Sequence, residues 1–187
     1  HRDNPDVGNR DDIWCMEFSS VLVRYDSLTT GGAWLASGAI AVNLGDGDNA
    51  ATFGNTVTGS EIGITTGLGT DYLTALAAWR STAGNVTVAM GNGANTIDVR
   101  AAVTAATGLS VTTGSGLDSL TSVGSLTAGG ALAISLGDGE NTALLNGALN
   151  GGDRNITTLN SFHLMTSRVG CLARVEIGVS LGVGESG

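Results

Sequence analysis

The chain of 187 residues has no lysine, a single proline, two cysteines and only 4 % aromatic residues. So few large rings disagree with a conventional globular core. The net charge of −9 would repel phosphate backbones, which argues against nucleic-acid binding. The apolar stretches are too short and too often interrupted to span a membrane. Disorder is also disfavoured, because 42 % of the residues are hydrophobic and they recur in register.

What the chain has instead is glycine, 30 residues of it, much of it in one recurring motif. The motif is Gly-x-Gly-x-(Asn/Asp), and its first glycines are 22, 24, 23 and 23 residues apart. A period in the twenties is typical of a solenoid, in which each repeat forms one turn. The five copies are Gly45-Asp-Gly47-Asp-Asn49, Gly67-Leu-Gly69-Thr-Asp71, Gly91-Asn-Gly93-Ala-Asn95, Gly114-Ser-Gly116-Leu-Asp118 and Gly137-Asp-Gly139-Glu-Asn141.

A short alternating run precedes each motif, as in Ile40-Ala-Val-Asn-Leu44 and Leu132-Ala-Ile-Ser-Leu136. Alternation with a period of two and β-branched residues predicts a strand with one buried face. The glycines then permit a tight corner. About 23 residues leave room for two or three short strands, so the sequence predicts an all-β fold, a parallel β-helix of one domain.

The motif alternates between two kinds of coil. Coils ending in Asn carry Leu44, Met90 or Leu136 before the first glycine, whereas coils ending in Asp carry Thr66 or Thr113. Two residues past the motif the sizes reverse, with Leu73 and Leu120 in the Asp coils against Ala51, Ile97 and Ala143 in the Asn coils. A bulky residue on one wall is thus matched by a smaller one on the other, as close packing requires. The true repeat is therefore a pair of coils, about 46 residues.

The same register extends beyond the five motifs. It predicts about eight coils of 22–24 residues, with an N-terminal arm and degenerate first coil over 1–18 and the β-solenoid over 19–187. One row of polar corner residues then forms a ladder along the molecule. Its members are Asp26, Asn49, Asp71, Asn95, Asp118, Asn141 and His163.

The segment Gly67-Leu-Gly-Thr-Asp-Tyr-Leu73 resembles the nonapeptide of RTX-type calcium β-rolls. In that family stacked corners hold Ca²⁺ through Asp carboxylates and backbone carbonyls. A looser likeness exists to the glycine- and threonine-rich repeats of large secreted bacterial β-solenoid proteins, which implies an extracellular or cell-surface location. The ligands that the RTX resemblance and the extra corner carboxylates imply are Asp46, Asp48, Asp71, Asp118, Asp138 and Glu140.

The ladder also has an explanation that needs no cofactor. Stacked like charges repel, and an Asn between successive Asp residues removes that repulsion. Asn and Asp side chains also hydrogen-bond to the local backbone at corners. Corner capping without metal and calcium binding at the same corner therefore both remain open.

Other chemistry finds little support in the sequence. Gly-x-Gly cradles phosphate only with a helix behind it, and no helical pattern follows. Two histidines and no paired cysteines argue against a transition-metal site, and no nucleophile motif accompanies them. We expect no enzyme, with a polysaccharide-acting β-helix enzyme as the weakest alternative. Asn85-Val-Thr87 and Asn155-Ile-Thr157 are glycosylation sequons.

The expected function is structural: a subunit of an extracellular filament or surface layer built by end-to-end stacking of solenoids. The alternative is a calcium-stabilised repeat segment of a secreted adhesin. Unpaired strand edges at solenoid ends favour self-association, and small outward residues on the first strand of each coil offer a surface for lateral contact. Cys15 and Cys171 lie near opposite ends of the chain, so they are either free thiols or an intersubunit disulfide across a stacked junction.

Overall fold

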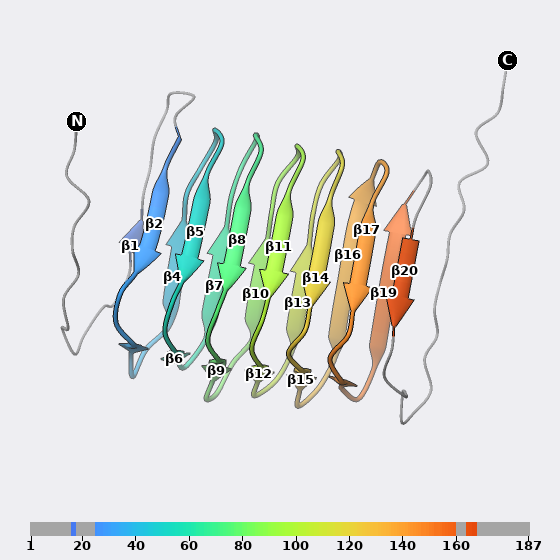
Figure 1. The fold of residues 1–187 in the computed structure, drawn as a ribbon. Coiled ribbons are helices and arrows are strands. Elements are labelled where there is room, and N and C mark those ends of the chain that lie inside the picture. The colour runs from blue at the N-terminus through green and yellow to red at the C-terminus, as the bar shows by residue number, and fades with distance from the viewer. Residues whose placement is uncertain (1–15, 18–24, 160–163, 168–187) are drawn as a thin grey trace, which may run out of the picture.

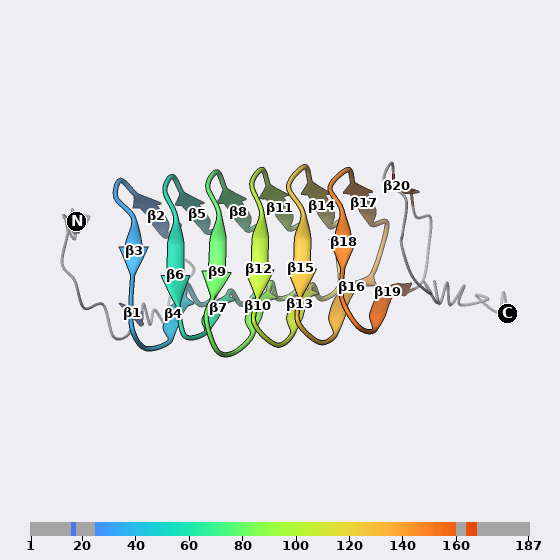
Figure 2. The same ribbon diagram turned by 90° about the horizontal axis from the view of Figure 1, so that it is seen from below.

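The computed structural model describes residues 16–17, 25–159 and 164–167. The described residues form twenty β-strands and no helix. All strand pairs are parallel, and each strand pairs with its equivalents one turn before and one turn after. The strands stack side by side in three sheets, which enclose the core as the faces of a prism (Figures 1 and 2). The prediction of an all-β parallel β-solenoid is confirmed.

Each sheet takes one strand from every turn. Sheet A contains β1 (Met16–Glu17), β4 (Ile40–Asn43), β7 (Ile62–Thr65), β10 (Val86–Ala89), β13 (Leu109–Thr112), β16 (Leu132–Asp138) and β19 (Arg154–Leu159). Sheet B contains β2 (Ser27–Thr30), β5 (Ala50–Phe53), β8 (Tyr72–Ala75), β11 (Thr96–Val99), β14 (Ser119–Ser122), β17 (Thr142–Leu145) and β20 (Leu164–Ser167). Sheet C contains β3 (Trp34–Leu35), β6 (Val57–Gly59), β9 (Trp79–Ser81), β12 (Val103–Ala105), β15 (Leu126–Ala128) and β18 (Leu149–Asn150).

The described strands make about six complete turns, because sheets A and B have seven strands and sheet C has six. The predicted count of about eight coils is therefore too high for this part of the chain. The additional predicted coils fall at the two ends, mainly on residues outside the described ranges. β1 lies within the segment 1–18 assigned to the arm and degenerate first coil, and it pairs with β4.

The variation in coil length is confined to one corner. The Gly-x-Gly corner between sheets A and B has constant length, and so does the corner between sheets B and C. At the third corner Ile62 follows Val57 by five positions, whereas Val86 follows Trp79 by seven. The coils of 22 and 24 residues therefore differ only between sheets C and A, where extra residues do not disturb the register of the glycines.

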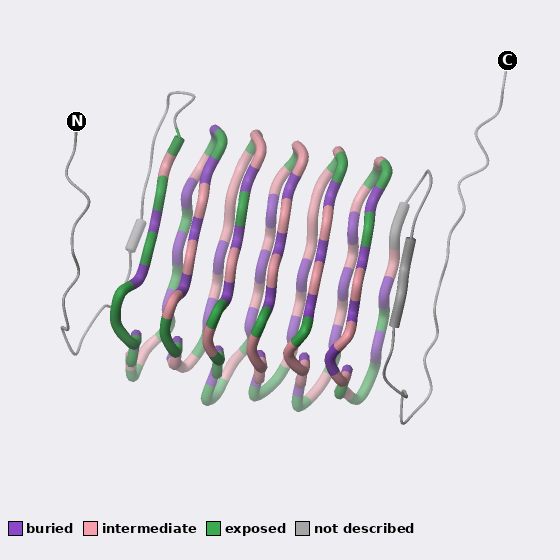
Figure 3. Tube along the Cα trace, in the orientation of Figure 1, coloured by how far each residue is buried: buried purple, intermediate pink, exposed green. Residues whose placement is uncertain are grey.

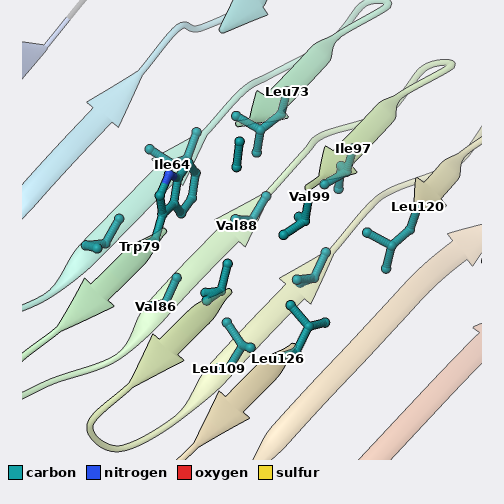
Figure 4. Packing of buried hydrophobic residues seen from close by; sticks show 14 of the residues in the cluster. Ile64, Leu73, Trp79, Val86, Val88, Ile97, Val99, Leu109, Leu120 and Leu126 are labelled. Carbon is teal, nitrogen blue, oxygen red and sulfur yellow. The ribbon is translucent and has the colours of Figure 1, made fainter. Parts of the chain in front are cut away.

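The core consists of the inward side chains of all three sheets (Figures 3 and 4). Leu44, Leu73, Leu120 and Leu136 are all buried, as the alternating pattern predicts. Large residues are offset by small ones in the next coil: Phe53 lies between Thr30 and Ala75 in its row. Phe53 also makes edge-to-face contacts with Trp34 and Trp79, at centroid distances of 5.6 and 4.9 Å. Such pairs are the geometry that aromatic quadrupoles favour.

Replacing Leu120 by Ala is expected to lower the free energy of unfolding by about 2–5 kcal/mol, because its side chain is fully buried between Ile97 and Ala143. The control is Thr121→Ala at the next, outward-facing position of β14, which should change stability little. Urea unfolding followed by circular dichroism measures both. Equal effects of the two substitutions would contradict the assignment of the buried face.

Candidate functional site

The Gly-x-Gly corner is the feature that recurs with the least change. Its glycines stack so closely that a Cβ on Gly91 would lie 1.8 Å from the carbonyl oxygen of Gly67, and one on Gly93 would lie 1.7 Å from that of Gly69. Gly93 also has a φ of 131°, which side-chain-bearing residues rarely adopt. No other residue type fits at these positions, so glycine sets the spacing of neighbouring coils.

The predicted Asn/Asp ladder lies directly after these glycines, and it forms one row along one edge. Five of the ladder residues are buried, with at most 2 % of the surface of each residue exposed. They are Asn49, Asp71, Asn95, Asp118 and Asn141. The backbone N–H of each ladder residue points to the next coil, where the Oδ1 atom of the following ladder residue accepts it. The distances are 3.2 Å for Asp26 to Asn49, 3.0 Å for Asn49 to Asp71, 3.1 Å for Asn95 to Asp118 and 2.9 Å for Asp118 to Asn141.

One rung departs from this pattern. Between Asp71 and Asn95 no such hydrogen bond forms, and the buried Oδ1 atom of Asn95 has no hydrogen-bond partner among the described residues. The first glycines of these two coils, Gly67 and Gly91, are separated by the longest interval, 24 residues. His163, the last predicted member of the ladder, lies outside the described residues.

The Asn members cap their own corner as well. The Nδ2 atom of Asn49 donates to the carbonyl of Gly47 at 2.9 Å, that of Asn95 to Gly91 at 2.8 Å and that of Asn141 to Gly137 at 2.6 Å. Asn49 Nδ2 also donates to Asp71 Oδ1 at 2.9 Å. A side chain with one donor and one acceptor group thus satisfies both its own corner and the neighbouring coil.

The Asp members bond to the neighbouring coil but have no amide to cap their own corner. Their Oδ1 atoms accept from the preceding coil, but the Oδ2 atoms of Asp71 and Asp118 are buried without a hydrogen-bond partner in the described part of the chain. A buried acceptor without a partner costs stability. These two oxygens, together with the Oδ1 atom of Asn95, are therefore the atoms of the ladder to which a further group could bind.

The two kinds of coil differ in hydrogen bonding and not only in the size of their side chains. Where an Asp coil follows an Asn coil, the first glycine donates to a glycine carbonyl, as Gly67 does to Gly45 at 2.7 Å. Where an Asn coil follows an Asp coil, the threonine hydroxyl is the acceptor: Gly91 N–H donates to Thr66 and Gly137 N–H to Thr113, both at 3.3 Å. Sequence reasoning assigned these threonines to size matching and missed this role. Their restriction to Asp coils was the available signal.

The outer carboxylates proposed as calcium ligands also bind the next coil. Asp46 Oδ1 accepts the N–H of Leu68, and Asp48 Oδ1 accepts that of Thr70, both at 2.8 Å. Asn92 accepts the N–H of Ser115 in the same way at 2.9 Å. This second, exposed row holds the coils of Asn49 and Asn95 to the Asp coils that follow them.

The structure does not gather the six candidate calcium ligands into one site. Asp138 and Glu140 lie four coils from Asp46 and Asp48, about 19 Å along the axis at ~4.8 Å per coil. The candidates form two exposed pairs and two separate buried carboxyls. Among the residues that the structure describes, no three His, Cys, Asp or Glu side chains are grouped to hold a metal ion. Cys15 and Cys171 lie outside the described ranges.

Comparisons with known proteins add no relative. No protein-family model matches the chain, and neither the curated proteins nor the solved structures contain a similar one. The chain is thus defined by its architecture, a three-sided parallel β-solenoid with an Asn/Asp ladder at one edge. No helix long and apolar enough to cross a membrane is present in the part of the chain that the structure describes.

Replacing Asn95 by Asp is expected to lower the free energy of unfolding by about 1–3 kcal/mol in metal-free buffer. The change removes the amide that donates to Gly91 and places a third carboxyl between Asp71 and Asp118. Asn92→Asp, three residues earlier, is the matched control: its side chain is exposed, its acceptor oxygen is kept, and Asp46 and Asp138 occupy the equivalent positions. Thermal unfolding by circular dichroism compares the two. If N95D is as stable as N92D, the ladder does not depend on the amide donor.

Replacing Gly93 by Ala should prevent or severely impair folding, because the new Cβ would overlap the carbonyl of Gly69. Gly63→Ala is the control, since Gly63 has open space around its Cα and lies in β7. Soluble yield and the β-sheet signal in circular dichroism report on both variants. Normal folding of G93A would show that the corners are less tightly stacked than the structure indicates.

Proposed function

We propose that this protein is a structural, self-assembling subunit of an extracellular filament or surface layer that grows by end-to-end stacking of solenoids. The observation that carries the proposal is the uniformity of the Gly-x-Gly corner. Four of the five described rungs of the ladder use the same bond from a backbone N–H to an Oδ1 atom, and the bonds of the glycines repeat every two coils, so another coil pair added in register finds the same kinds of partner. Stability in such an array is a sum of nearest-neighbour terms, and length is not limited by the fold.

The use made of the polar groups supports a structural role over a catalytic one. The ladder carboxylates are buried and accept backbone N–H groups, and Asp46 and Asp48 are likewise bound to the next coil. Carboxylates held in this way position the backbone of the neighbouring coil. An oxidising exterior would also suit a disulfide between Cys15 and Cys171 of successive subunits.

The second candidate function is a calcium-stabilised segment of a secreted adhesin. The buried, unpartnered Oδ2 atoms of Asp71 and Asp118 favour it, because a carboxylate oxygen with no donor is a potential ligand for a hard cation. Calcium would then bind at the Asp coils alone, and the Asn coils would remain as they are.

The test is electron microscopy and sedimentation velocity of the purified full chain, with calcium or a chelator and with or without reductant. Ordered filaments in the presence of chelator support end-to-end assembly, and shortening by reductant supports the disulfide. Calcium-dependent folding without filaments favours the adhesin segment. A monomer under all four conditions overturns the proposed function.

A further inference from the structure

The two-coil alternation of the interior also appears on the surface. Each coil is named by its ladder residue. The Asp coils are 25–39, 62–85 and 109–131. The Asn coils are 40–61, 86–108 and 132–153. Within residues 25–157, every large hydrophobic residue that is exposed belongs to an Asp coil. These residues are Tyr25, Leu35, Leu68, Tyr72, Leu76, Leu117 and Val123.

Charge follows the opposite pattern. Within residues 25–157, apart from the ladder and the buried Arg154, all charged residues except Arg80 belong to Asn coils. They are Asp46, Asp48, Glu61, Asp98, Arg100, Asp138, Glu140 and Asp153. The surface is therefore banded, with apolar and charged bands that alternate along the axis and repeat every two coils, about 9.6 Å.

The bands are strongest on the two edges that flank sheet B. The Gly-x-Gly edge carries the acidic pairs Asp46/Asp48 and Asp138/Glu140, with Leu68 and Leu117 in the coils between them. The opposite edge carries the residues that directly follow β8, β11 and β14. These are Leu76, Arg100 and Val123, in three successive coils.

Between the two edges the middle of the outer face of sheet B is mostly hydroxylated. The outward position in the middle of its strands is occupied by Thr29, Thr52, Thr74 and Thr121, with Asp98 and Leu144 completing the row. Asp98 binds the Nε atom of Arg100 at 2.8 Å, which fixes the guanidinium at the edge. None of these residues is aromatic, whereas Tyr72 faces outward beside this row at the start of β8.

We propose that a second copy of this chain packs its sheet B against sheet B of the first, with the two solenoid axes parallel and offset by two coils. A half turn about an axis parallel to the solenoid brings the Gly-x-Gly edge of one copy opposite the Arg100 edge of the other. An antiparallel arrangement would place the two Gly-x-Gly edges together and the two Arg100 edges together, so Arg100 would have no acidic edge opposite it.

The charges select the offset. Without an offset Arg100 lies opposite Asn92 and Ala94, which carry no charge. With an offset of one coil it lies in the apolar band of Leu117. With an offset of two coils, Arg100 of one copy meets Asp138 and Glu140, and Arg100 of the other meets Asp46 and Asp48.

The same two-coil offset pairs the apolar residues. At one edge of the contact, Leu76 of the first copy lies opposite Leu117 of the second. At the other edge, Val123 of the second copy lies opposite Leu68 of the first. Leu68, Leu117 and Val123 are each more than half exposed in the single chain, so burying them provides the hydrophobic contribution. The complementary charges and the spacing belong to one and the same chain, and for this reason the partner is a second copy.

This contact rests on the self-association proposed above but is separate from end-to-end stacking. A two-coil offset leaves two coils of each copy overhanging. In a filament the lateral contact would then overlap the axial junctions. Filament width reports on the lateral contact and filament length on the axial one, so each can fail alone.

The test uses Arg100→Glu and Glu140→Arg, with Arg80→Glu as the matched control. Arg80 undergoes the same charge reversal but lies on sheet C, away from the proposed face. Glu140 is exposed and makes no hydrogen bond within the described part of the chain, so its reversal leaves the fold intact. Sedimentation velocity gives the lateral dissociation constant, electron microscopy gives filament width and circular dichroism verifies folding.

R100E breaks both ion-pair sites and should raise the lateral dissociation constant about tenfold, whereas R80E should leave it unchanged. E140R alone breaks one site and should have a smaller effect. An equimolar mixture of R100E and E140R should pair as the unmodified chain does, because the reversed charges meet at one site and the original charges at the other.

Three results would overturn the inference: wild-type width retained by R100E, an equal effect of R80E, or no pairing in the mixture. Pairing that tolerates R100E but is lost with Leu68→Ser and Leu117→Ser together would show contact without the two-coil offset. Long filaments of single-solenoid width would refute the lateral contact and leave the proposed function standing. Paired chains that never elongate would support the lateral contact and refute the end-to-end stacking of the proposed function.

Discussion

The hydrogen bond from a ladder N–H to a side chain in the next coil, made at four of the five described rungs, is the interaction on which the corner of the structure depends. At the corner the backbone turns away from the sheets, so the usual strand partner is absent and a buried N–H needs another acceptor. Asp and Asn side chains provide it one coil further on. The backbone hydrogen bonds of the parallel sheets set the axial spacing, that spacing requires glycine at the corner, and the ladder bond holds each corner to the next.

Alternation follows from the different demands of the two residue types. A ladder of Asp alone would stack carboxyls directly on one another, and interposed Asn separates them. Asn additionally supplies the amide that binds the corner carbonyls, which Asp lacks. The threonine hydroxyl before the first glycine of an Asp coil then accepts the glycine N–H of the next Asn coil. The pair of coils is therefore a unit of hydrogen bonding, and size matching in the core accompanies it.

Much of this could be predicted from the sequence, because strand alternation and the glycine motif are both local and periodic. The period, the ladder of Asp26 to Asn141 and the burial of Leu44, Leu73, Leu120 and Leu136 all follow from residue spacing. The number of sheets could not be predicted from this spacing, since about 23 residues accommodate two or three strands. Nor could the role of Asp46 and Asp48, because an exposed carboxylate at a corner looks the same whether it binds an ion or the N–H of Leu68 and Thr70.

The outward residues can follow a pattern of their own because the packing of the core does not constrain them. Folding requires only inward apolar residues, the glycines and the ladder, so outward positions can change without disturbing the register. Leu76 and Val123 nevertheless occupy equivalent exposed positions one coil pair apart, and the acids Asp46 and Asp138 do so two coil pairs apart. A surface that repeats with the period of its own interior has, in any second copy, a partner with matching spacing. The constraint that orders the coils inside the molecule thus also provides the spacing with which two molecules can recognise each other.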